Sequence, residues 1–336
     1  MTRDELREAL LERPLKSLME EALSIKRTYY GDRIFIRGLI EVSNYCTQDC
    51  YYCGIRASHS IQRYRLTAKE IISACKKGYE VGFRTFVMQG GEDPHLSDEF
   101  LVPILRYLKE NYPDTAVTLS LGERSMESYQ RLFLAGADRY LLRHETIDKR
   151  HFSKLHPAWQ SLKTRVEKLH ELREIGYQTG CGIMVGSPYQ EIDHLVEDLL
   201  FMREFKPHMV GIGPFIPHHE TIFKDEPAGD LEMTLRMLAL TRILLPDVLL
   251  PATTALATLD PRGRELGLAC GANVLMPNLS PPESREKYNL YDGKAQAPGE
   301  AAEALQRLKV ELDKLGHHMV VARGDHPSKE NYEHTL

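Results

Sequence analysis

Three cysteines lie close together near residue 50 and could carry chemistry. Residues 43–56 read SNYCTQDCYYCGIR and place Cys46, Cys50 and Cys53 in a C-x3-C-x2-C array. The chain has only six cysteines in 336 residues, so this clustering needs a chemical reason. A disulfide knot, a zinc site and an iron–sulfur cluster are the three candidates.

The composition indicates a reducing compartment and therefore a metal. The first 27 residues are charged throughout and have no apolar core, so we expect neither a signal peptide nor a transit sequence. No apolar run is long enough to cross a membrane. We therefore expect the protein in the cytoplasm and away from membranes, where thiols stay reduced. This argues against disulfides.

The number of clustered thiols favours iron over zinc. Structural zinc usually takes four protein ligands, whereas here three thiols stand together. The other cysteines, Cys75, Cys181 and Cys270, stand alone in apolar segments, and we expect them to be buried. Three thiolates suit a four-iron cluster in which one iron stays open for a small molecule. We expect one such [4Fe–4S] cluster.

The bulk charge argues against a nucleic-acid partner. The formal net charge is −5 and the isoelectric point is near 6.3, so the sequence predicts no broad basic surface. Hydrophobic residues make up 42% and charged residues 27%, as in ordinary globular proteins.

Hydrophobic periodicity predicts eight alternating strands and helices. This pattern favours an α/β fold, a (βα)8 TIM-type barrel with an N-terminal helix and a C-terminal helical extension, over a doubly wound open sheet. Thr67 with Glu70 forms a capping-box pattern, and Ser125 and Asp230 are plausible N-caps. The expected strands are residues 35–43, 83–89, 116–122, 138–145, 178–186, 208–215, 248–255 and 272–277. The expected helices are residues 3–27, 67–80, 97–111, 125–135, 159–175, 191–205, 230–245, 262–269 and 298–315.

These elements divide the chain into three parts. We expect a helical extension over residues 1–30, the barrel over residues 31–292, and a C-terminal helix and tail over residues 293–336. The tail reads RGDHPSKENYEHTL, which is polar, and we expect it to be poorly ordered.

Polar residues follow several predicted strands, where barrel enzymes carry their chemistry. QGGED (89–93) follows the second strand, and RHET (143–146) follows the fourth. Arg143 and Glu145 need partners at such a position, so either they form an ion pair or they bind a polar ligand.

The cysteine array, together with Tyr52 before its last cysteine, resembles the signature of the radical S-adenosylmethionine (SAM) superfamily. GGED resembles the glycine-rich motif of that superfamily. The resemblance implies that an open iron chelates SAM and that the reduced cluster cleaves SAM to a 5′-deoxyadenosyl radical. It places Gly90, Gly91 and Glu92 near the amino group of SAM and Tyr52 near its adenine.

Longer blocks resemble the HydE family of iron–iron hydrogenase maturases. They are YLLRHET, VTLSLGE, MVGIGPFIPH, LTRILLPDVLLPATTA and CGANVLMPN. The resemblance implies that Arg143, Glu145 and Arg165 contact SAM. It places Arg37, Ser120, Thr253, Thr254, Met209 and Met276 around a substrate cavity. It further implies a small-molecule or organometallic substrate, an electron donor such as ferredoxin or flavodoxin, and the maturases HydF and HydG as partners.

One departure keeps alternatives open. Many HydE relatives carry three further cysteines near the C-terminus, but none follows Cys270 here, so we expect no second cluster. Another radical SAM enzyme is the first alternative, similar to methylornithine synthase (PylB) or biotin synthase. Biotin synthase would need ligands for a second cluster inside the barrel. A non-catalytic iron–sulfur protein is the second alternative, and it would need a fourth cysteine ligand.

Overall fold

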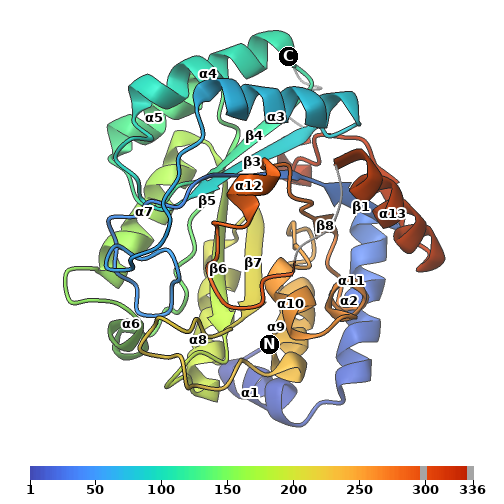
Figure 1. Cartoon of the computed structure of the whole chain (residues 1–336). Helices are drawn as coiled ribbons and strands as arrows, with labels where there is room; N and C mark the ends of the chain where they lie inside the picture. The colour runs from blue at the N-terminus through green and yellow to red at the C-terminus, as the bar shows by residue number, and fades with distance from the viewer. Residues whose placement is uncertain (296–300, 331–336) are drawn as a thin grey trace.

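Parallel strands in chain order form the centre of the molecule, and helices surround them (Figure 1). The structure is a computed structural model and describes residues 1–295 and 301–330. Six strands form one sheet in the order β2-β3-β4-β5-β6-β7, and three form another in the order β8-β1-β9. The strands are β1 (Arg33–Ile36), β2 (Gly38–Ser43), β3 (Thr85–Gly90), β4 (Ala116–Ser120), β5 (Arg139–Leu141), β6 (Gln178–Val185), β7 (Met209–Pro214), β8 (Val274–Leu275) and β9 (His318–Val320).

Helices follow most strands, as the TIM-type fold requires. They are α1 (Arg3–Leu11), α2 (Leu15–Tyr30), α3 (Ala68–Glu80), α4 (Asp98–Asn111), α5 (Met126–Leu134), α6 (Lys149–Leu155), α7 (Leu162–Ile175), α8 (Ile192–Phe205), α9 (Leu231–Leu244), α10 (Thr254–Leu259), α11 (Gly263–Ala269), α12 (Pro282–Arg285), α13 (Ala301–Lys314) and α14 (Pro327–Glu330). The predicted capping box of Thr67 and Glu70 is present, and Ser125 and Asp230 cap α5 and α9. The predicted α/β barrel class is confirmed.

The strand predicted over residues 248–255 is wrong. That segment makes only isolated parallel bridges, Met209 with Leu249 and Pro251 with Val274, and α10 begins at Thr254. Pro251 has no N–H to donate to a ladder, which weakens pairing on one side. A further bridge, Leu39 with Asn278, links the last segment back to β2.

The first strand and the first helix are both broken. The predicted strand 35–43 is interrupted at Arg37, so that β1 pairs with β8 and β9 while β2 pairs with β3. The predicted helix 3–27 is two helices, because Pro14 caps the start of α2 and cannot continue an α-helical hydrogen-bond ladder.

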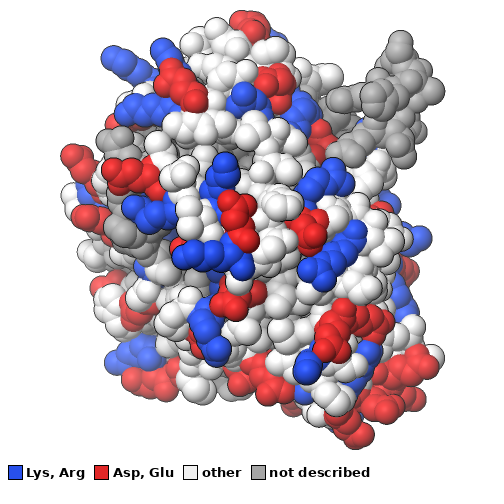
Figure 2. Space-filling view, turned by 90° about the vertical axis from the view of Figure 1, so that its right-hand side faces the viewer, with Lys and Arg blue, Asp and Glu red and all other residues white. Residues whose placement is uncertain are grey.

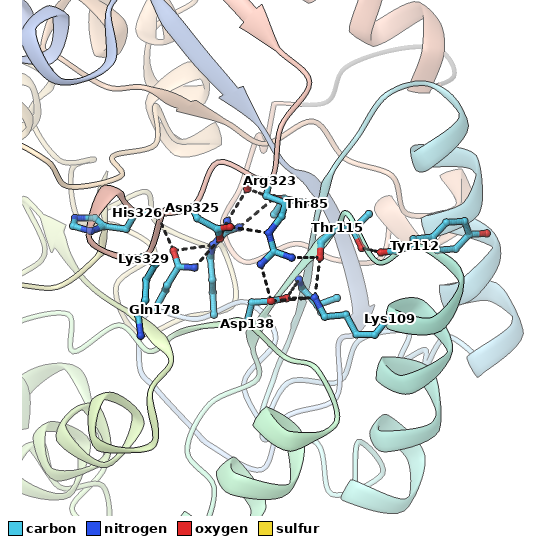
Figure 3. Close-up of polar contacts among 12 residues, drawn as sticks. Thr85, Lys109, Tyr112, Thr115, Asp138, Gln178, Arg323, Asp325, His326 and Lys329 are labelled. Atoms are coloured by element: carbon cyan, nitrogen blue, oxygen red, sulfur yellow. Dashed lines mark hydrogen bonds and ion pairs between the residues drawn. The ribbon is translucent and has the colours of Figure 1, made fainter. Parts of the chain in front are cut away.

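The prediction of a poorly ordered tail is wrong for residues 323–330. After β9, the chain crosses the end of the barrel where the strands begin (Figure 3). Asp325 Oδ1 accepts hydrogen bonds from Arg139 Nη2 at 2.5 Å and from Gln178 Nε2 at 2.7 Å, and Arg139 is fully buried. Arg323 Nη2 lies 2.9 Å from Asp138 Oδ1. Residues 331–336 lie outside the described part of the chain.

The surface carries mixed charge. On the face shown in Figure 2, basic and acidic side chains are interspersed over most of the surface, and acidic side chains gather at the lower right of the view. Within the described residues, every helix is too short or too polar to cross a bilayer.

Candidate active site

The three cysteines lie on a long loop between β2 and α3, which Asp93 of the GGED segment fastens at both ends. Asp93 Oδ2 accepts from Ser43 Oγ at 2.6 Å and from Arg65 Nε at 2.8 Å, and these residues lie at the start and the end of the loop. A backbone bond from Thr47 N to Glu92 O, at 3.0 Å, adds a third tie. The loop is therefore positioned by the carboxyl end of β3.

The spacing of the three thiols does not fit a single metal ion. All six cysteines are free. The sulfur atoms of Cys46, Cys50 and Cys53 do not all lie within 4.8 Å of one another. Two thiolates on one tetrahedral zinc lie about 3.8 Å apart, from a Zn–S bond of about 2.3 Å. The arrangement instead leaves room for a larger inorganic core with three corners held.

Burial keeps these thiols protonated until a metal binds. Desolvation raises the pKa of Cys50 to about 12 and raises the pKa of Cys46 and Cys53 as well. Thiolates are the metal-binding form, so metal loading must release protons from these side chains.

The absence of a side chain at Gly91 lets the cysteine loop lie close against the end of β3. The glycine therefore serves packing within the protein as well as the approach of a ligand. A Cβ added at Gly91 would lie 2.3 Å from the Tyr45 carbonyl oxygen and 2.6 Å from Cys46 Cβ. At Gly90, the added Cβ would lie 3.2 Å from the Ser43 carbonyl oxygen. The glycine pair therefore fixes the cysteine loop against the end of the strand.

Glu92 lies in a charged network with Arg165. Arg165 Nη2 is 3.5 Å from Glu92 Oε1, and its Nε is 2.5 Å from Glu123 Oε1. Although burial disfavours the guanidinium charge, Glu123 and Glu92 raise the pKa of Arg165 above its usual value. Gly122 makes room for Glu92, because an added Cβ would lie 1.9 Å from Glu92 Cγ.

Arg143 and Glu145 form an ion pair after β5. Arg143 Nη2 lies 2.9 Å from Glu145 Oε2 and donates to the Ile183 carbonyl oxygen at 2.6 Å. Arg143 Nε is buried without a hydrogen-bond partner among the described residues. Glu145 has a φ of 65°, which is uncommon for a residue with a side chain and marks a functional candidate. The charge of Glu145 is close enough to help raise the pKa of Tyr52 and of Cys53. The pair therefore lies beside the cysteine loop.

Tyr52 uses its hydroxyl within the protein. His156 Nδ1 lies 3.0 Å from the Phe152 carbonyl oxygen and must donate to it, so Nε2 accepts from the Tyr52 hydroxyl at 3.3 Å. Tyr52 packs against the hydrophobic cluster of Leu155, Met184, Phe215 and Phe223. The hydroxyl of Tyr52 is therefore engaged within the protein, and a ligand would meet its ring.

Two glutamines near the cysteines were not predicted as site residues from the sequence. Gln160 Nε2 donates to Gln48 Oε1 at 2.7 Å, and its amide lies 3.4 Å from Cys50 Sγ. Gln48 Nε2 in turn donates to Glu92 Oε2 at 2.7 Å. Gln48 lies inside the cysteine array and could have been flagged there, but no local pattern marks Gln160.

The predicted substrate residues fall into two groups. Arg37 Nη1 lies 3.0 Å from Met209 Sδ, while Arg37 Nε and Nη2 are buried without a hydrogen-bond partner among the described residues. Burial, with Arg139 nearby, lowers the pKa of Arg37. Thr253, Thr254 and Met276 instead line one cavity of about 290 Å³. Ser120 pairs with Gln89 at the ends of β4 and β3 and belongs to neither group.

The remaining cysteines are structural. Cys75, Cys181 and Cys270 are fully buried in the main hydrophobic core, as expected. Burial raises the pKa of all three. Within the described residues, they supply neither a fourth ligand to the cysteine loop nor a second thiol cluster.

The residues at this rim fit an iron–sulfur cluster and a zwitterionic ligand. Three thiols on one loop could hold one inorganic core, and Arg165, Glu92, Arg143 and Glu145 supply both signs of charge near that loop. Such a set can bind a molecule that carries an ammonium group and a carboxylate.

Comparison with known proteins agrees with this geometry. Residues 40–202 match the family model described as the Radical SAM superfamily. The chain is 48% identical, over 297 residues, to the [FeFe] hydrogenase maturase subunit HydE of Thermotoga maritima, covering 87% of this chain and 84% of that protein. It is 28% identical to the 3-methylornithine synthase of Methanosarcina acetivorans, covering 84% of this chain and 79% of that protein. The crystal structure of methylornithine synthase (PylB) matches with a TM-score of 0.85 at 25% identity, covering 100% of this chain and 96% of that one. This chain belongs to the radical SAM superfamily, as an enzyme similar to the maturase HydE.

Proposed function

We propose that this enzyme acts in the maturation of the FeFe-hydrogenase active site, as HydE does. The observation that carries the proposal is the 48% identity to HydE over most of both chains. Identity to the methylornithine synthase sequence is far lower, at 28%. The six free cysteines also fit a reducing compartment such as the cytoplasm.

Each residue at the rim then has a role. Cys46, Cys50 and Cys53 would hold a [4Fe–4S] cluster, and the backbone of Gly90 and Gly91 would lie along the bound SAM. When bound, the reduced cluster and SAM together would supply a 5′-deoxyadenosyl radical. Arg165 and Arg143 would receive the SAM carboxylate, Glu145 and Glu92 its ammonium group, and Tyr52 the adenine face.

The barrel interior would receive the substrate. Two buried nitrogens of Arg37 have no hydrogen-bond partner in the part of the chain that the structure describes, which favours an anionic group beside them. Met209 contacts Arg37, and Ser120 at the end of β4 would lie further along this interior. Thr253, Thr254 and Met276 line the cavity of about 290 Å³ and would contact the substrate there. An iron–cysteine carbonyl–cyanide complex has the charge that this setting accepts. An electron donor such as ferredoxin or flavodoxin, and the maturases HydF and HydG, would be the partners.

The chemistry can be tested without the substrate. Reconstituted, reduced protein with SAM under anoxia should form 5′-deoxyadenosine, whereas the Cys50→Ala variant should lose the cluster and this product. The matched control is Cys75→Ala, which removes a buried thiol of the main hydrophobic core. If Cys50→Ala cleaves SAM as the unmodified protein does, the assignment is wrong.

The physiological role needs a second assay. Apo-hydrogenase incubated with HydF, HydG and this enzyme should gain hydrogenase activity that is lost with the Cys50→Ala variant. The structural match to PylB favours one alternative, a mutase acting on an amino acid. Methylornithine formed from lysine, with no activation of hydrogenase, would establish that alternative instead.

A further inference from the structure

A cavity opens through the side of the barrel. Its volume is about 290 Å³, near the lower end of the range for small-molecule sites. Its inner wall carries Leu39, Thr253 and Met276, and its outer wall carries Ala304 and Leu308 of α13. It therefore runs from the barrel strands out to the C-terminal helix, on the face where α13 and α11 lie (Figure 1).

The wall of the barrel is incomplete at this place. Residues 248–255, where the seventh strand of the barrel was expected, make only two isolated bridges. At Thr254 the chain begins α10 instead of continuing beside residues 276–278. On its other side, Asn278 is bridged to Leu39. The opening between these two segments is the inner mouth of the cavity.

The lining carries more positive than negative charge. Four cations, Arg264, Arg285, Lys294 and Arg307, stand against one carboxylate, Glu311. Arg264 pairs with Glu311 at 2.9 Å, but both are exposed, and such surface pairs contribute little and open readily.

Arg285 is the cation best placed for a ligand. Its Nε donates to the Ser280 carbonyl oxygen at 2.7 Å, and among the described residues no carboxylate contacts its guanidinium. Lys294, by contrast, pairs with the buried Glu41. An anion in the cavity would therefore meet an available guanidinium at Arg285.

The cavity leads toward Arg37 inside the barrel. Met276 packs against the cluster that contains Met209, and Met209 Sδ contacts Arg37. The end of the barrel where the strands begin is closed by residues 323–326. The opposite end is where the proposed function, on which this inference rests, places SAM.

We propose that this side cavity is the entrance by which a small anionic substrate reaches the barrel interior. The ligand is a compact anion of the size of a carboxylate-bearing metal complex. It is drawn in by Arg285 and received by Arg37, and it can enter while SAM occupies the rim. Entry and SAM cleavage are thus separate properties of the chain.

Bromide is a suitable probe, because its anomalous scattering locates it directly. Crystals of the reconstituted protein with SAM would be soaked briefly in sodium bromide. Two variants on α13 are matched. Ala304→Trp places an indole in the cavity, whereas Ala302→Trp places one on an exposed position of the same helix. Arg285→Glu is compared with Lys309→Glu, which lies outside the lining.

The inference predicts bromide beside Arg37 in the unmodified protein, in Ala302→Trp and in Lys309→Glu. It predicts at least a tenfold lower occupancy in Ala304→Trp and Arg285→Glu at the same soaking time. Equal occupancy in Ala304→Trp and Ala302→Trp, or no bromide beside Arg37 in the unmodified protein, overturns it.

SAM cleavage separates this result from the proposed function. Without substrate, 5′-deoxyadenosine formation should stay within about twofold in all four variants, which also shows that they fold. If SAM cleavage is normal but bromide does not reach Arg37, the proposal of an entrance is wrong and the proposed function still stands. If the unmodified protein does not cleave SAM, the proposed function is wrong. The proposal of a substrate entrance, which rests on that function, is then wrong as well.

Discussion

At the scale of single residues, the site depends on glycines that bring backbone and charge together. Gly122 has a φ of +75°, and an added Cβ would meet Glu92 Cγ at 1.9 Å. We predict that Gly122→Ala displaces Glu92 and weakens SAM binding at least tenfold, as measured by equilibrium binding to the reconstituted protein.

Gly316→Ala is the control for that prediction. Gly316 has a similar φ of +73°, but an added Cβ meets nothing within 4 Å. It should show only the backbone strain of about 1–2 kcal/mol in unfolding, with SAM binding unchanged. Equal SAM affinity in both variants would show that Glu92 need not hold its position.

Residue types predicted much of the site because their chemistry is local. The spacing of Cys46, Cys50 and Cys53 is visible in the sequence, as is the glycine pair before Glu92. The contact of Gln160 with Cys50 joins residues 110 positions apart, and only the folded chain shows it. The steric role of Gly91 against Cys46 is hidden in the same way.

At the scale of elements, the C-terminal segment is part of the barrel. Arg139 is fully buried, and Asp325 is its carboxylate partner. We predict that Asp325→Ala lowers the free energy of unfolding by about 3–5 kcal/mol, because it leaves a buried charge unpaired. Chemical denaturation measures this change.

The double variant Asp325→Ala with Arg139→Met tests the cause. Removing both charges should recover a large part of the lost stability, since an apolar replacement of a buried pair is often neutral. If the double variant is as unstable as the single one, the loss comes from packing of the tail and not from the unpaired charge.

Elements with strong periodicity were predictable, and those held by distant partners were not. The polar composition of residues 323–330 suggested disorder, yet buried partners on β3, β5 and β6 order the segment. The segment 248–255 is apolar like a strand, but Pro251 and the start of α10 limit its pairing.

At the scale of the whole molecule, buried neutral histidines should make stability depend on pH. Burial lowers the pKa of His156 to about 3 and of His151 to about 4. In the unfolded chain they protonate below about pH 6.5. The unfolded state then binds more protons, so stability falls as the pH falls.

Between pH 6.5 and pH 5, each such histidine should reduce the free energy of unfolding by about 1.6 kcal/mol in total, with a slope that approaches about 1.4 kcal/mol per pH unit at the lower end. Urea denaturation between pH 7 and pH 5 measures the slope, and His156→Gln should reduce it by the contribution of one proton. An unchanged slope in that variant would mean that His156 is already charged in the folded protein.

The proposed chemistry requires that three thiolates leave one iron open for SAM. Electron paramagnetic resonance of the reduced, reconstituted protein tests it with SAM labelled by ¹⁵N in its amino group. We predict a [4Fe–4S] signal that changes on adding SAM and shows hyperfine coupling to the ¹⁵N nucleus. A signal unaffected by SAM and without this coupling, or zinc in place of iron, would contradict the account.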